Sequence, residues 1–114
     1  MRFLVLLTEK DHFDIWDAAD ADLRRRTIDD YNAFGDAVRK LGTLVVGDAL
    51  ARPEEARTRR PGGSVTRGPF AETVEQIGGF YLVDLPDLDT AVEVAGLLPR
   101  EYTIEVRPTV QVEV

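Results

Sequence analysis

The fold is decided by residues 22–42, DLRRRTIDDYNAFGDAVRKLG, which have the pattern of one long amphipathic helix. Apolar side chains recur there every three or four positions, a spacing that places them on one helical face: Ile28, Tyr31, Phe34, Val38 and Leu41. Gly42 follows at once and predicts the end of the helix. Apolar runs that flank this stretch on both sides predict strands.

The rest of the chain predicts a second strand–helix–strand unit. Strands are expected at residues 3–7, 44–46, 80–83 and 102–106, and residues 9–20 are expected to be irregular. The second helix has a periodic apolar face: Leu88, Ala91, Val92, Ala95 and Leu98. Residues 57–60 and 64–67 flank Pro61-Gly62-Gly63 and predict an inserted hairpin. We therefore expect one domain over residues 1–114 with an α+β, ferredoxin-like βαββαβ fold.

This fold has a consequence for assembly. Both helices are expected to cover the same face of the sheet, which leaves the other face bare. A large apolar face is rarely left to water, so the arrangement predicts a homodimer. The alternating valines Val110, Val112 and Val114 are candidates for that interface, or for a strand exchanged with the partner.

Composition excludes several classes of function. The net charge of −7 argues against nucleic acid and against an anionic membrane surface as partners. Cysteine is absent and there is one histidine, so we expect no disulfide and no metal site. No phosphate-binding or dinucleotide-binding glycine motif occurs, so no cofactor is expected. The apolar run at residues 3–7 is too short for a signal peptide or a membrane span, and we expect a cytoplasmic protein.

Charged side chains near the hairpin are candidates for a site. If residues 72–75 form a helical turn, Glu72 and Glu75 point to the same side and can act as acid and base; the alternative is a solvated turn. Arg57, Arg59 and Arg67 can bind an anion, or they can protect an exposed edge from pairing. We favour the protective role for Arg60.

The single histidine, His12, lies in the segment that we expect to be irregular. Its unperturbed pKa range makes it the natural proton carrier near neutral pH. A lone histidine in such a segment is most often solvated, and a catalytic role requires a carboxylate from elsewhere in the fold. Asp48, at the end of a predicted strand, is the natural candidate. Trp16 can close over a pocket, but it more commonly packs on a sheet edge.

Several motifs together resemble the YCII-related, or DGPF-domain, family: Gly68-Pro69-Phe70-Ala71-Glu72-Thr73, Glu75-Gln76, Gly78-Gly79-Phe80-Tyr81, Gly47-Asp48-Ala49-Leu50 and Glu105-Val106-Arg107-Pro108. The resemblance implies a dimeric α/β-barrel arrangement, in which two sheets face each other around a cleft. Some members carry a His–Asp pair proposed as catalytic, and several are encoded beside sigma factors. This chain has Arg67 in place of the motif aspartate and Val74 in place of a lysine.

These observations lead to two main hypotheses. The first is a dimer that binds a small polar or anionic metabolite in a cleft, with cofactor-free proton transfer of isomerase or lyase type. Glu72 would be the base and Arg67 the anion anchor, and Arg59, Glu75 and Asp48 would border the ligand. The second is a non-catalytic regulatory protein, for example an accessory of a sigma factor. A third, purely structural interpretation treats all these charges as surface residues.

Overall fold

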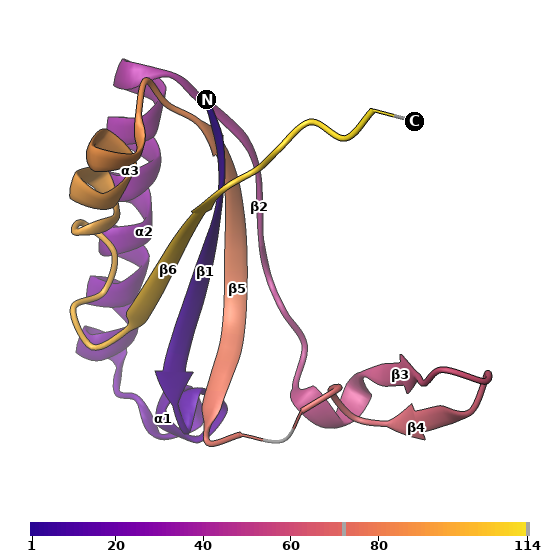
Figure 1. Cartoon of the computed structure of the whole chain (residues 1–114). Coiled ribbons are helices and arrows are strands. Elements are labelled where there is room, and N and C mark those ends of the chain that lie inside the picture. Colours follow the sequence, from indigo (N-terminus) through magenta and orange to yellow (C-terminus); the bar gives the residue numbers. More distant parts are fainter. Residues whose placement is uncertain (72, 114) are drawn as a thin grey trace.

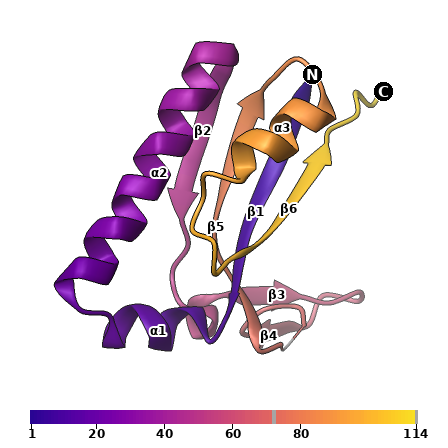
Figure 2. The same cartoon turned by 90° about the vertical axis from the view of Figure 1, so that its left-hand side faces the viewer.

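A computed structural model describes residues 1–71 and 73–113. One sheet of four antiparallel strands has the order β2–β5–β1–β6, and a separate two-stranded hairpin consists of β3 and β4. The elements are β1 Arg2–Lys10, α1 His12–Ala18, α2 Ala21–Leu41, β2 Thr43–Ala49, η1 Pro53–Glu55, β3 Arg57–Arg59, β4 Val65–Arg67, β5 Glu75–Asp84, α3 Leu88–Ala95 and β6 Thr103–Pro108 (Figures 1 and 2).

The first strand, β1, lies in the middle of the sheet between β5 and β6. Val5 pairs with Tyr81 on one side and with Val106 on the other. Since β2 joins the outer edge of β5, the two strand–helix–strand units interleave as in a ferredoxin-like α+β fold. The fold class and the inserted hairpin predicted from the sequence are confirmed.

The core lies between the sheet and the helices α2 and α3. Phe3, Val5 and Leu7 of β1 are at most 5% exposed, whereas their neighbours Leu4 and Leu6 point to the opposite face and are half-buried. The helices add the buried residues Phe34, Val38, Ala91 and Val94. The run at residues 3–7 therefore alternates between two environments, although both of its faces carry apolar side chains.

The long helix ends as its sequence predicts. The side chain of Asp20 accepts a hydrogen bond from the backbone N–H of Leu23 at its start. Gly42 donates its N–H to the carbonyl of Val38 at its end, and a Cβ on Gly42 would lie 1.9 Å from the carbonyl oxygen of Asp84. Only glycine fits at this close approach. Two residues of the predicted buried face, Ile28 and Leu41, are instead about half exposed.

Three predicted segments differ from the structure. Residues 9–20 are not irregular, because β1 continues to Lys10 and α1 follows at residues 12–18. The strand predicted at residues 80–83 extends over residues 75–84, with a shift of register between Leu7 and Thr8 of its partner. Residues 109–113 form no strand in the structure, and Val110 and Val112 are exposed; Val114 lies outside the described residues.

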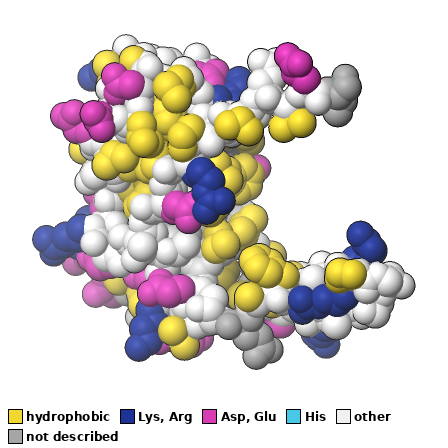
Figure 3. All heavy atoms as spheres, in the orientation of Figure 1, with side chains coloured by type: hydrophobic (Ala, Val, Ile, Leu, Met, Phe, Trp, Pro, Cys, Tyr) yellow, Lys and Arg dark blue, Asp and Glu magenta, His cyan; other side chains and the backbone are white. Residues whose placement is uncertain are grey.

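One face of the sheet is uncovered. Figure 1 shows α2 and α3 on one side of the sheet, and the β3–β4 hairpin and the C-terminal segment extending to the other side. Hydrophobic side chains lie along the recess between these two extensions (Figure 3). The radius of gyration is 15.7 Å, larger than the roughly 13 Å of a compact domain of this length. Within the described residues, no helix is both long and apolar enough to cross a membrane.

Candidate functional site

A cavity of about 90 Å³ lies where α1 meets α2 and the segment before β6. Its chemistry comes from side chains on four parts of the fold: Glu9, His12, Trp16, Arg26, Glu101 and Tyr102. The cavity thus combines acids, a guanidinium, a phenol and the one imidazole of the chain in a small volume. Such a mixture in a recess is the pattern expected of a site that handles protons.

His12 and Glu9 form the central pair of this cavity. Nδ1 of His12 lies 3.0 Å from Oε1 of Glu9, and the two side chains are only 13% and 10% exposed. In the tautomer that carries its proton on Nδ1, the imidazole donates this hydrogen bond to the carboxylate. That tautomer leaves the lone pair on Nε2, which makes no hydrogen bond to the part of the chain that the structure describes. The pair therefore has the arrangement of a base held by an acid.

The backbone around His12 fits the ring closely. A Cβ on Gly78 would lie 2.3 Å from Nε2 of His12, so the ring lies directly over a strand position that has no side chain. Asp11 adopts a left-handed conformation with φ of 55°, and its N–H donates to the carbonyl of Val74 at 3.0 Å. This turn lets α1 begin at His12, immediately beside β5.

An aromatic wall completes the pocket beside His12. The ring of Tyr102 lies edge-on to the imidazole at 5.6 Å between centroids, and its hydroxyl is 2.7 Å from that of Tyr31. Burial raises the pKa of both phenols, and their mutual hydrogen bond raises the pKa of Tyr102 further. Both tyrosines are therefore neutral at physiological pH and are able to donate hydrogen bonds.

An ion pair borders the opposite side of the cavity. Arg26 of α2 donates from NH2 to Glu101, and this bond lowers the pKa of the Glu101 carboxyl. Nε of Arg26 is buried and has no hydrogen-bond partner among the described residues. A buried donor without an acceptor is uncommon and often marks a functional position.

The short helix α1 forms the cover of the cavity. Arg24 donates to the carbonyl of Trp16 at 2.9 Å, and its guanidinium lies 5.1 Å from the centre of the indole ring. Arg52 forms an ion pair with Asp17 and lies 5.6 Å from the ring of Phe13. These contacts are exposed, and they add to the buried pair of His12 and Glu9 in holding α1 over the cavity.

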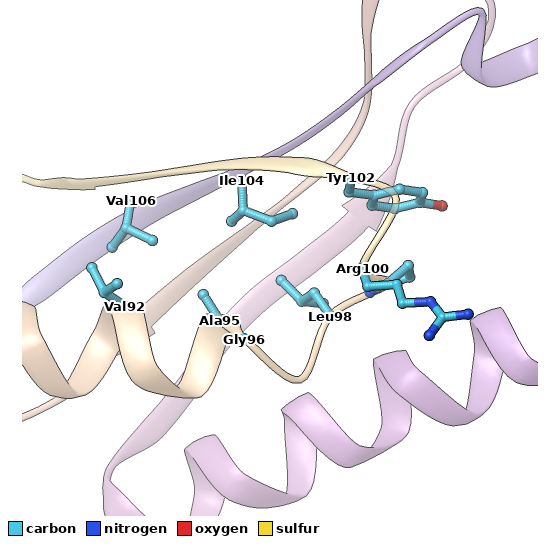
Figure 4. Close-up of a pocket in the computed structure, with 9 residues that line it drawn as sticks. Val92, Ala95, Gly96, Leu98, Arg100, Tyr102, Ile104 and Val106 are labelled. Carbon is cyan, nitrogen blue, oxygen red and sulfur yellow. The ribbon is translucent and has the colours of Figure 1, made fainter.

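A second, larger cavity of about 350 Å³ is a groove between α3 and β6. Figure 4 shows Val92, Ala95 and Leu98 facing Ile104 and Val106, with Tyr102 and Arg100 at one end. Tyr102 lines this groove and also the cavity with His12. The two recesses are therefore adjacent.

The site residues predicted from the sequence lie elsewhere. Arg59 and Arg67 are exposed on the hairpin, where Nε of Arg67 donates to the carbonyl of Glu54 at 3.3 Å. Glu75 is the exposed first residue of β5, and Asp48 pairs in register with Phe80 on the uncovered face. None of these four residues lines either cavity described above. Glu72 lies outside the described residues, so its role as a base stays a prediction.

For His12 the interpretation as a solvated residue was wrong. It lies on a helix, is largely buried, and takes Glu9 rather than Asp48 as its carboxylate. The sequence contains a sign of this pairing. Phe3, Val5 and Leu7 are followed by Glu9 at the same spacing of two, so an acid occupies a core-facing position three residues before the histidine.

Comparison with known proteins places this chain in a family. Residues 1–110 match the family model of the YCII-related domain. The chain is also 50% identical over 48 residues to an uncharacterized protein of Rhizobium meliloti (strain 1021), a match that covers 39% of this chain and 39% of that protein. Among the described residues, no group of three or more histidine, cysteine or acidic side chains is arranged to hold a metal ion.

Proposed function

Because the chain belongs to the YCII-related domain family, we propose that it is a homodimeric protein that binds a small polar or anionic metabolite and transfers a proton within it without a cofactor. The single observation that carries this proposal is the buried contact between His12 and Glu9 on the wall of a cavity. In this proposal His12 is the general base, and the reaction is of isomerase or lyase type.

The chemistry follows from the roles of three side chains. Nε2 of His12 takes a proton from a carbon beside a carbonyl group, and the Glu9 carboxylate stabilises the imidazolium that forms. The neutral phenol of Tyr102 turns its one proton from the hydroxyl of Tyr31 to the oxygen on which negative charge develops. The proton then returns from His12 to a different atom of the same molecule, so nothing is oxidised or reduced. A positioned base of this kind typically contributes about 10²- to 10⁴-fold to the rate.

The volume of the cavity limits what enters it. A space of about 90 Å³ equals roughly the share of three water molecules in the liquid. Only the reacting end of a metabolite fits beside His12. Arg26, with its buried Nε and its partner Glu101, favours an end that carries hydrogen-bond acceptors, such as a carbonyl or carboxylate group.

This proposal moves the base from Glu72 to His12, and the two assignments can be tested together. The chain contains one tryptophan and one histidine, and Trp16 and His12 line the same cavity. Fluorescence of Trp16 therefore reports binding, and the imidazole NMR signals of His12 report the reacting group without interference from other histidines.

The experiment is hydrogen–deuterium exchange at C3 of small 2-oxo acids, the carbon beside the ketone, in heavy water, followed by NMR. We expect exchange to be accelerated by the wild type and reduced about 10²-fold or more by His12→Gln, with a smaller loss for Glu9→Gln. Arg25→Gln, on an exposed part of α2, is the control and is expected to exchange as the wild type does. Equal rates for wild type and His12→Gln would overturn the proposal, and a loss confined to Glu72→Gln would restore the original assignment.

A further inference from the structure

The groove between α3 and β6 has the properties of a ligand site of its own. Its volume of about 350 Å³ lies within the range of roughly 300–1,000 Å³ that is typical of small-molecule pockets. Its walls are aliphatic along most of its length (Figure 4). Val92, on the α3 wall, is 55% exposed to water. Apolar side chains that gather in an open recess commonly mark a surface that another molecule covers.

One end of the groove carries guanidinium groups. The Glu101 carboxylate pairs with Arg26 and lies 3.8 Å from Nε of Arg100. Two guanidinium groups thus lie beside one carboxylate, and Glu9 and Asp30 add negative charge near Tyr102 and Arg26. Arg100 makes no side-chain hydrogen bond to the described residues, so its donors are available to an acidic group in the groove. Arg26 lines the cavity of His12 and Arg100 lines the groove, so the guanidinium groups lie at the junction of the two recesses.

We propose that the groove binds the aliphatic tail of an amphipathic carboxylate whose acidic head lies at this junction, next to Tyr102. Tyr102 is the wall that both recesses share, so an elongated ligand would extend from the groove towards His12. The guanidinium groups supply charge complementarity to the head, and the aliphatic walls supply burial for the tail. This inference rests on the proposed function, because it names the class of molecule whose reacting end His12 would meet.

The position of the groove separates this ligand from the proposed partner copy. The groove is formed on the side of the sheet that carries the helices, whereas the homodimer is assigned to the uncovered side. A charged end and aliphatic walls fit a single molecule with one acidic group. A second copy or a peptide in the groove is an outcome that would contradict the proposal.

The test is a series of straight-chain alkanoates from acetate to octanoate. Binding is measured by Trp16 fluorescence and by the methyl NMR signals of Val92, Ile104 and Val106. We expect affinity to rise about two- to fourfold for each added methylene, because the tail enters the groove. The matching 1-alkanols, which have no charge, are expected to bind more weakly at every length. An affinity that does not change with chain length would overturn the proposal.

Different variants test the contacts of the aliphatic tail and of the acidic head. Val92→Asp places a charge on the groove wall and should abolish the increase per methylene, while Val65→Asp, the same change at an exposed valine of the hairpin, should leave it intact. Arg100→Gln should weaken every alkanoate by a similar factor, because its 86% exposed side chain supports the head and not the fold. Equal behaviour of Val92→Asp and Val65→Asp would contradict the tail assignment.

The failure of this inference and of the proposed function can be distinguished. Affinity for alkanoates could depend on chain length while His12→Gln catalyses the hydrogen–deuterium exchange as fast as the wild type does. In that case the groove binds an amphipathic carboxylate and only the proton-transfer function is wrong. If exchange depends on His12 but affinity is independent of chain length, only the groove assignment is wrong.

Discussion

Gly78 is the residue on which the position of His12 depends most directly. A methyl group there would lie 2.3 Å from Nε2 of the imidazole and within 2.8 Å of two of its carbon atoms. We expect Gly78→Ala to displace the ring from Glu9 and to destabilise the fold by about 1–3 kcal/mol, as other overpacking substitutions do. Urea unfolding measures the stability, and the imidazole NMR signals report the displacement.

Gly35 offers the matched control for this substitution. A Cβ at this helical glycine would lie 3.1 Å from the flexible end of Arg39 and 3.7 Å from Leu44, so a methyl group can be accommodated. We expect Gly35→Ala to be neutral or to stabilise by up to about 1 kcal/mol, because alanine favours a helix more than glycine does. If both alanine variants had wild-type stability and unchanged His12 signals, the close fit at Gly78 would be disproved.

The sequence revealed the chemistry of single residues only in part. The ring that lies over Gly78 belongs to His12, 66 positions earlier in the chain, and no local pattern connects the two residues. Glu9 was overlooked because residues 3–7 were interpreted as a continuous apolar run. The alternation within that run places Glu9 on the buried face, and it becomes apparent once β1 is known to continue to Lys10.

At the scale of elements, α3 shows how a cap makes stability depend on pH. The Asp87 carboxylate accepts a hydrogen bond from the backbone N–H of Thr90 at 2.8 Å, and this bond lowers the pKa of Asp87 below its ordinary value of 3.8. Since the folded-state pKa is the lower one, the cap stabilises the fold above the ordinary value. That contribution is lost as the pH falls through 3.8 towards the folded-state pKa.

We therefore expect Asp87→Ala to lower the urea midpoint near neutral pH and to have a progressively smaller effect as the pH falls below 3.8. Asp89→Ala, at an acid in the first turn of α3 that does not form the cap, should lower the midpoint less near neutral pH. A difference between Asp87→Ala and wild type that stayed constant with pH would contradict this assignment of the cap.

Elements in which apolar residues recur with a clear period could be predicted from the sequence. Elements that depend on contacts with distant parts of the chain could not. Phe34 and Val38 of α2 are buried at the spacing that the sequence predicts, and the end of the helix at Gly42 follows from the absence of a side chain. The helix α1 has no fully buried residue, because this short helix packs only one of its sides against β5. The extension of β5 to Glu75 crosses two glycines that weaken any local preference for a strand, and it forms because β1 pairs with it.

At the scale of the whole molecule, the uncovered sheet face remains the basis for a homodimer. Leu6 and Leu82 lie on this face, because they alternate along their strands with the buried residues Val5, Leu7 and Val83. We expect light scattering to give the mass of a dimer at micromolar concentration. Leu6→Lys should shift the protein towards the monomer, because it places a charge in the proposed interface.

Ile28→Lys is the control for the dimer experiment, because Ile28 is 47% exposed on α2, on the side of the sheet away from the uncovered face. It should leave the mass unchanged. A wild-type protein that is monomeric at this concentration would exclude the homodimer, and with it any role for the hairpin arginines Arg59 and Arg67 in a cleft between two copies.

The central position of β1 also affects how the chain can fold while it is being made. Residues 2–8 form a strand whose neighbours are residues 77–84 and 103–108, so this strand leaves the ribosome well before either of its partners has been made. Until then, both edges of this apolar strand lack their hydrogen-bonding partners. Nascent chains that end before β5 should therefore bind chaperones that recognise extended hydrophobic segments, and they should be released from them once β6 has emerged.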